Sequence, residues 1–226
     1  MGRHAATAIV LLLLVGTAVA FAETERLKLK PTPIEESFVQ PAFSPACECE
    51  TSKAEIRIRL YRADTVTVRI LDDTGRVVRT LIEGKRLPRG RTVLLWNGRD
   101  HAGDLAPDGS YRVEVRLDQA DRTFELPHAV ALDTVAPSVR LVSNTEGVRT
   151  RQRVRIFYRV NEPAHGILFV NGKKRVGPTY TKALAAKLDW RPERPGRYRL
   201  ELAAVDLAGN LGPRTPPFEV RVTSPA

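Results

Sequence analysis

The chain contains two copies of a Gly-x-Tyr-Arg segment that opens an alternating apolar and acidic run, and each copy follows a single tryptophan. The copies are GSYRVEV, residues 109–115, and GRYRLEL, residues 196–202. Trp96 precedes the first copy and Trp190 the second, and they are the two tryptophans of the chain. A repeated unit constrains the architecture, because each copy is expected to be one structural module. A chain of 226 residues can hold two modules of roughly a hundred residues, each with its own core.

Alternation of apolar and polar residues predicts short strands along most of the chain. AEIRIRL, residues 54–60, puts its apolar side chains on one face and its charged side chains on the other, and RVRIFYRV, residues 153–160, does the same. Asn171-Gly172 between two apolar runs predicts a tight hairpin. Short strands spaced roughly eight to twelve residues apart indicate an antiparallel sandwich or barrel.

The first 22 residues have the order of an export signal. A short basic start is followed by an apolar run over residues 5–22 that ends in small residues at Ala18, Ala20 and Ala22. This order predicts a cleaved signal peptide, and an uncleaved membrane anchor is the alternative reading. Both readings predict a secreted or envelope-associated protein. Residues 23–42 contain prolines and mixed charge and are interpreted as a linker.

The segment LDTVAPSVRL, residues 132–141, predicts the joint between the modules. Pro137 cannot donate to a sheet ladder, so it is expected at the entry of a new strand. The predicted modules are therefore residues 43–136 and residues 137–226.

Two stretches of the first module resemble a known family. VTVRILDDTGRVVRTL, followed by LLWNGRDHAGDLAPDGSYRVEV, is similar to the Ig-like domain of the flagellar hook-capping protein, the FlgD-type Ig domain. The second module resembles bacterial surface Ig-like repeats through DTVAP, residues 133–137, and AVDLAGN, residues 204–210. The resemblance implies an all-β fold of two tandem immunoglobulin-like β-sandwiches behind the N-terminal signal or anchor segment. The positions that carry the first match are Asp72 or Asp73, Gly75, Val78, Arg79, Leu81, Trp96, Asn97, Gly98, Asp100, Gly103, Gly109 and Tyr111.

In such a sandwich the repeated aromatic residues are expected to be structural. A buried tyrosine ring can pack on a tryptophan while its hydroxyl bonds to a backbone group at the corner of the sandwich. We therefore expect Tyr111 to pack on Trp96 and Tyr198 to pack on Trp190. Gly109 and Gly196 are expected to permit the backbone conformation of the turn before each strand.

No catalytic, metal or cofactor site is predicted. The histidines lack partners at metal-ligand spacing, and the motifs of common hydrolases and phosphate loops are missing. Asp100, Asp104 and Asp108 recur every fourth residue, whereas a calcium loop alternates its ligands every second residue. These aspartates are interpreted as braces of turns, and the chain is predicted not to be an enzyme.

Cys47 and Cys49 are the two cysteines of the chain. Outside the cytoplasm a C-x-C pair is interpreted as a local disulfide, with metal ligation and cross-linking between chains as the other readings. Two residues apart on an extended strand, their Cα atoms would lie about 7 Å from each other, so a disulfide requires a bend in the chain.

The charge of the chain is concentrated in one module. The chain carries a formal net charge of +10; residues 137–226 hold 17 basic and 7 acidic residues, whereas residues 43–136 hold 15 of each. Arginines of one parity around RTRQRVRIFYRV predict a ladder on the outer face of a strand. The proposed polyanion-binding residues are Arg149, Arg151, Arg153, Arg155 and Arg159, with Lys173, Lys174 and Arg175 at the hairpin.

These features predict a non-enzymatic binding or structural module of the cell envelope. Its expected ligand is an anionic wall polymer or a lipid surface, and a solvated basic surface without a ligand is the plainer reading. Nucleic acid is not expected, because Phe157 is the one aromatic residue on the face that the arginines share. The alternatives are an assembly or adaptor protein that docks a protein partner through sheet edges, and an accessory module of a separate enzyme. No particular oligomeric state is predicted.

Overall fold

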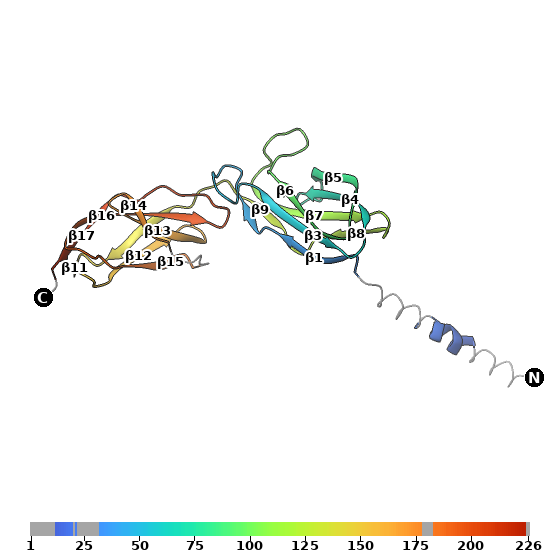
Figure 1. Cartoon of the computed structure of the whole chain (residues 1–226), viewed down its shortest axis with the longest axis horizontal. Coiled ribbons are helices and arrows are strands. Elements are labelled where there is room, and N and C mark those ends of the chain that lie inside the picture. The colour runs from blue at the N-terminus through green and yellow to red at the C-terminus, as the bar shows by residue number, and fades with distance from the viewer. Residues whose placement is uncertain (1–11, 20, 22–31, 178–182, 225–226) are drawn as a thin grey trace, which may run out of the picture.

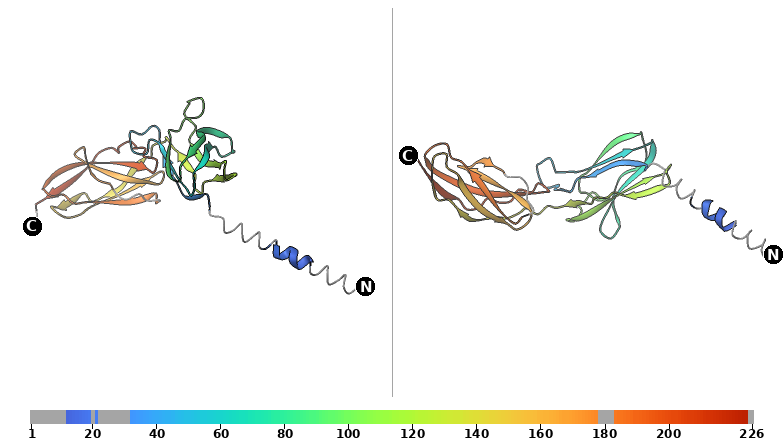
Figure 2. Two further views of the ribbon diagram at one scale, coloured as in Figure 1. Left: turned by 45° about the vertical axis from the view of Figure 1, so that its right-hand side comes forward. Right: turned by 90° about the horizontal axis from the view of Figure 1, so that it is seen from below.

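The computed structural model describes residues 12–19, 21, 32–177 and 183–224. Two β-rich modules lie end to end in an elongated molecule (Figure 1), and the views in Figure 2 show the same arrangement. Residues 12–19 are helical, and most of the predicted leader lies outside the described residues. None of the described helical residues forms a helix that is long and apolar enough to cross a membrane.

The first module is built from two sheets, whose strands pair antiparallel except for the short parallel pair of its two-residue and three-residue strands at residues 42–43 and 130–132. One sheet has the order β1-β3-β6, and the other has the order β2-β9-β7-β4-β5 with β8 paired to β7. The strands are β1 (Ile34–Val39), β2 (Ala42–Phe43), β3 (Ala54–Leu60), β4 (Asp64–Leu71), β5 (Val77–Leu87), β6 (Gly90–Trp96), β7 (Gly109–Leu117), β8 (Arg122–Glu125) and β9 (Val130–Leu132).

Strand β1 lies inside the segment that the sequence predicted to be a linker, residues 23–42. It pairs antiparallel with β3, so that Val39 lies opposite Ile56. The segment IEESFV shows no clean alternation, and it is the partner strand that stabilises its extended form. The first module therefore begins at Ile34 and not at residue 43.

The second module repeats the two-sheet plan. Its sheets have the orders β10-β12-β15 and β11-β17-β16-β13-β14. The strands are β10 (Val139–Asn144), β11 (Gly147–Arg149), β12 (Val154–Val160), β13 (Ala164–Val170), β14 (Lys173–Val176), β15 (Ala185–Trp190), β16 (Gly196–Asp206) and β17 (Phe218–Thr223).

The predicted alternation builds a separate core in each module. In β3 and β12 every second side chain is buried, as the sequence predicted. The larger cluster of buried residues draws on residues 39–132, and a second cluster draws on residues 148–222. The predicted hairpin at Asn171-Gly172 is confirmed, because both residues have positive φ and join β13 directly to β14.

Candidate binding surface

Each module contains the same tryptophan and tyrosine pair at the same place in its fold. The ring centroids of Trp96 and Tyr111 lie 4.9 Å apart with an interplanar angle of 68°, and those of Trp190 and Tyr198 lie 5.0 Å apart at 71°. The hydroxyl of Tyr111 donates to the carbonyl of Pro107 at 2.5 Å, and the hydroxyl of Tyr198 donates to the carbonyl of Arg194 at 2.8 Å. In both cases the acceptor lies four residues upstream. These aromatic residues are therefore occupied in holding the sandwich corner.

The glycines of the two repeats differ in what they require. Gly109 and Gly196 are the first residues of β7 and β16. Gly196 has a φ of +153°, a conformation that favours glycine, whereas Gly109 has no positive φ. Of these two glycines, only Gly196 therefore has a backbone conformation that favours glycine.

The predicted arginine ladder on one strand is wrong. Strand β12 begins at Val154, so Arg149 and Arg151 lie outside it. Arg149 ends β11 in the opposite sheet, and Arg151 occupies a turn with φ +67°. In the sequence the arginines continue to alternate through this turn. Because the chain turns there between two sheets, odd-numbered arginines before and after the turn do not lie on the same face.

A basic face nevertheless forms, from three strands instead of one. Arg155 and Arg159 project outward from β12, because their neighbours in the strand are buried. Arg140 of β10 lies directly opposite Arg159, and Lys187 of β15 lies opposite Phe157. Directly opposed residues share a face of the sheet. The basic face is defined here as Arg140, Arg155, Arg159 and Lys187 around the exposed ring of Phe157.

The four cations of the basic face make no ion pair among the described residues, although Asp189 lies directly opposite Arg155 on the same face. Arg153 pairs with Asp189 at 3.1 Å at the margin of the face. The other ion pairs of the second module join Glu201 to Arg199 and Arg214 on the opposite sheet. The four residues of the basic face are all exposed and make no ion pair within the described ranges. The face can therefore attract an anion without first losing an internal salt bridge.

The basic hairpin belongs to the other sheet. Lys173, Lys174 and Arg175 lie at the start of β14, the edge strand next to β13, and all three are exposed. The structure therefore separates them from the basic face that the sequence expected them to extend.

The aspartates of the long loop between β6 and β7 brace backbone groups. Asp100 accepts from the amide of Asp104 at 3.0 Å, and Asp108 accepts from the amide of Thr134 at 3.0 Å. They line a cleft of about 520 Å³ together with Tyr111. Burial and, after it, the charges of nearby aspartates raise the pKa of the Tyr111 hydroxyl. The Asp100 carboxylate thus holds its own turn, and the Asp108 carboxylate ties the loop to Thr134 in the segment that connects the modules.

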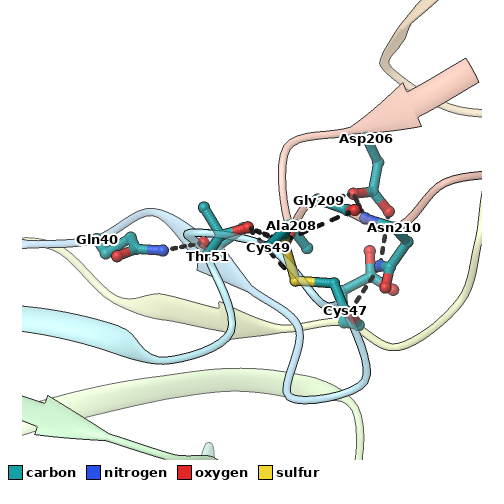
Figure 3. The surroundings of a disulfide bond; sticks show 10 residues. Gln40, Cys47, Cys49, Thr51, Asp206, Ala208, Gly209 and Asn210 are labelled. Atoms are coloured by element: carbon teal, nitrogen blue, oxygen red, sulfur yellow. Dashed lines mark hydrogen bonds between the residues drawn. A yellow bond between two sulfur atoms is a disulfide. The ribbon is translucent and has the colours of Figure 1, made fainter.

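The two cysteines form a disulfide where the modules meet. Cys47 and Cys49 are bonded, and their Cα atoms lie 5.2 Å apart. Figure 3 shows this bond against the turn that contains Ala208, Gly209 and Asn210. The Oγ1 of Thr51 donates to the carbonyl of Ala208 at 2.6 Å across the junction.

Three carboxylates also gather at the junction. The closest oxygens of Asp133, Glu162 and Asp206 lie within 4.8 Å of one another. Burial first, and then the charges of the other two, raise the pKa of the Glu162 carboxyl. Burial likewise raises the pKa of Asp133, with smaller contributions from Asp206 and Asp108. Asp206 is buried and accepts hydrogen bonds from its own turn.

The first module matches a known family. A family profile described as the FlgD Ig-like domain matches residues 45–121, which span β3 to β7. The first module contains a FlgD Ig-like domain. This confirms the resemblance seen in the sequence. No curated protein sequence matches the chain.

Several solved structures are similar to the chain at low sequence identity. The fibronectin(III)-like modules of CbhA from Clostridium thermocellum match with 12% identity and a TM-score of 0.46 over 84% of this chain and 95% of that one. The D0-D1 domain of intimin matches with 12% identity and a TM-score of 0.33 over 83% and 98%. A biofilm-associated protein BSP domain matches with 13% identity and a TM-score of 0.30 over 84% and 30%. Likeness at this level concerns the class of fold alone.

The sequence did not indicate the contacts between the FlgD Ig-like domain and the module that follows it. The three junction carboxylates are separated by 29 and 44 residues, at positions 133, 162 and 206, so no short spacing motif could reveal them. The C-x-C pair was the one available signal. It predicted a bend in the chain but not the surface against which the bend would pack.

Proposed function

We propose that this chain is an exported, non-enzymatic module of the bacterial cell envelope, made of two tandem Ig-like domains. In this proposal the FlgD Ig-like domain is structural, and the second domain binds an anionic polymer of the envelope through the basic face. The observation that supports the proposal most strongly is the set of unpaired cations Arg140, Arg155, Arg159 and Lys187 on one sheet.

The chemistry of the basic face suits an extended polyanion. Four cations on adjacent strands can each attract an anion weakly. A polymer with repeated negative charges can contact several of them at the same time. Phe157, 43% exposed at the centre of the face, adds an apolar contact. Because exposed charges are screened by salt, such binding is expected to weaken steeply as ionic strength rises.

The test is cosedimentation of the full chain with purified bacterial envelopes and with vesicles containing phosphatidylglycerol, across a salt series. The variant replaces Arg140, Arg155, Arg159 and Lys187 by Ser. At about 1 kcal/mol for each of the four cations near an anionic surface, we expect binding to fall by roughly a hundred- to a thousandfold at low salt. Envelope binding without vesicle binding would indicate a wall polymer as the ligand.

A matched control removes the same amount of charge from the first module. Arg62, Arg86, Arg89 and Arg122 are exposed and make no ion pair in the described structure, and they are replaced by Ser together. The control is expected to bind like the parent chain. Equal loss in both variants would show that only net charge matters, and the proposal would then fail.

The second candidate function is assembly through sheet edges. Strand β6 is an edge strand of its sheet, and Val93 and Leu95 on its outer face are 49% and 57% exposed. An edge of this kind can pair with a strand of another protein. Binding by this route would be insensitive to salt, and replacing Val93 and Leu95 by Lys would abolish it.

A further inference from the structure

The loop that contains the disulfide packs against one turn of the second module. The disulfide loop is residues 44–52, and the receiving turn is residues 206–210. Thr51 Oγ1 donates to the Ala208 carbonyl at 2.6 Å. Cys49 Sγ lies 3.9 Å from the Gly209 carbonyl oxygen, and since a disulfide sulfur has no proton to donate, this is a packing contact.

The receiving turn is held rigidly by its own hydrogen bonds. The carboxylate of Asp206 accepts from the amide of Gly209 at 2.7 Å and from the amide of Asn210 at 2.9 Å. The side-chain amide of Asn210 donates to Asp206 and to the carbonyl of Asp133, each at 2.8 Å. Asp133 belongs to the segment that connects the modules, so the turn is anchored to the connection itself.

Gly209 is the point at which the two surfaces leave no room. Its φ is +97°, and a Cβ added there would overlap Thr51 Oγ1 and come within 2.5 Å of Cys49 Sγ. By contrast, a Cβ added at Gly172, with φ +78°, would meet nothing within 4 Å. The backbone of the receiving turn therefore fits closely against the disulfide loop.

The disulfide determines the shape of the loop that makes this contact. The Cα atoms of Cys47 and Cys49 are 5.2 Å apart, shorter than the roughly 7 Å of an extended pair. Three backbone hydrogen bonds complete the loop, from Ser44 N to Thr51 O at 3.0 Å, from Cys47 N to Ser44 O at 3.1 Å and from Ser52 N to Cys49 O at 3.2 Å. With the cysteines reduced, nothing covalent would keep residues 47–49 bent.

We propose that the Cys47–Cys49 disulfide fixes the relative orientation of the two modules by holding the disulfide loop on the receiving turn, and that reduction by a dithiol releases it. Cys49 is exposed, so an external thiolate can attack its sulfur. This forms a mixed disulfide and frees the Cys47 thiolate, which takes a proton. The second thiolate of the dithiol then displaces the Cys49 sulfur, which is protonated in turn, and the dithiol becomes a disulfide. The module cores are unaffected, because neither core depends on this bond.

The test measures residual dipolar couplings of backbone amides in the full chain. In the oxidised parent one alignment tensor is expected to fit both modules. After treatment with dithiothreitol, and in the oxidised Gly209→Ala variant, each module is expected to require its own tensor. The oxidised Gly172→Ala variant is the matched control for a positive-φ glycine and is expected to keep one tensor.

Two further readouts separate release from unfolding. Amide dispersion within each module must stay unchanged on reduction. The oxidised Thr51→Val variant keeps the disulfide but loses the hydroxyl that donates to Ala208 and contacts Cys49 Sγ at 3.0 Å, and it must also lose the common tensor. A reduced chain that keeps a single tensor would overturn the proposal, and so would a Gly209→Ala chain that behaves like Gly172→Ala. Polyanion binding does not enter these outcomes, because the basic face lies outside the contact.

Discussion

The two modules share the packing of their sandwich corner and differ in the use of their surface charge. Trp96 with Tyr111 and Trp190 with Tyr198 have nearly the same distance, angle and hydroxyl acceptor position. The first module pairs many of its arginines with carboxylates, on both sheets and at its turns. Within the part of the second module that the structure describes, the four cations of the basic face make no ion pair. The same aromatic corner can thus support a charge-neutral module and a basic one.

The two aromatic corners are not equally buried. Trp96 has no exposed surface, whereas Trp190 and Tyr198 are only half-buried. Phe43 packs on Trp96 as well, with ring centroids 5.2 Å apart. The aromatic corner therefore contributes more to the core of the first module than to that of the second.

The largest effect is expected from truncating the tryptophans. Trp96→Ala should destabilise the first module by about 3–5 kcal/mol, because a large side chain leaves a cavity in the core. Trp190→Ala should cost roughly 2 kcal/mol, since the ring is already partly in water. Urea unfolding of the full chain, followed by amide signals of each module, measures both. Equal losses would contradict the difference in burial.

A smaller effect is expected from the tyrosine hydroxyls. Tyr111→Phe removes a part-buried hydrogen bond to Pro107 and should cost about 1 kcal/mol. Tyr198→Phe removes an exposed one, which water can replace, so the cost should be a few tenths of a kcal/mol. The same unfolding measurement applies. A larger loss for Tyr198→Phe would mean that the second corner is more dependent on its hydrogen bond than its exposure indicates.

The smallest effect is a pH-dependent gain at the junction. The pKa of Glu162 is raised above its ordinary value of 4.5, so its ionised form destabilises the fold. Above the raised pKa, Glu162→Gln should be slightly more stable than the parent. Below about pH 4.5 the carboxyl is protonated in both folded and unfolded chains, and the gain should vanish. Thermal melts across this range measure it, with exposed Glu193→Gln as the control that should show no such gain.

The sequence predicted the parts of the fold that depend on local alternation. Residues 54–60 and 154–160 alternate strictly, and their buried and exposed sides follow the prediction, because side chains of a strand point to opposite faces in turn. The Asn171-Gly172 turn was equally local. The duplicated tyrosine strand indicated the repeated aromatic corner because both partners of each pair lie close in the sequence.

Features that depend on distant segments could not be predicted. Strand β1 is extended because β3 pairs with it, and its own sequence gives little sign of this. The predicted series of arginines is interrupted by a turn at Arg151. The basic face therefore contains Arg140 and Lys187 from neighbouring strands and does not contain Arg149. The fit of Gly209 against the disulfide loop joins residues about 160 positions apart, and no pattern in one chain reveals such a contact.

The proposed binding site for the polyanion is the basic face, and not the hairpin or the first module. The most direct measurement is a titration of the isotope-labelled full chain with a defined galacturonic acid oligomer at low salt, followed by amide and side-chain chemical shifts. We predict that the largest shifts centre on Arg140, Phe157 and Arg159 and disappear with added salt. Shifts centred on Lys173 to Arg175 or on the FlgD Ig-like domain would show that the basic face is not the binding site.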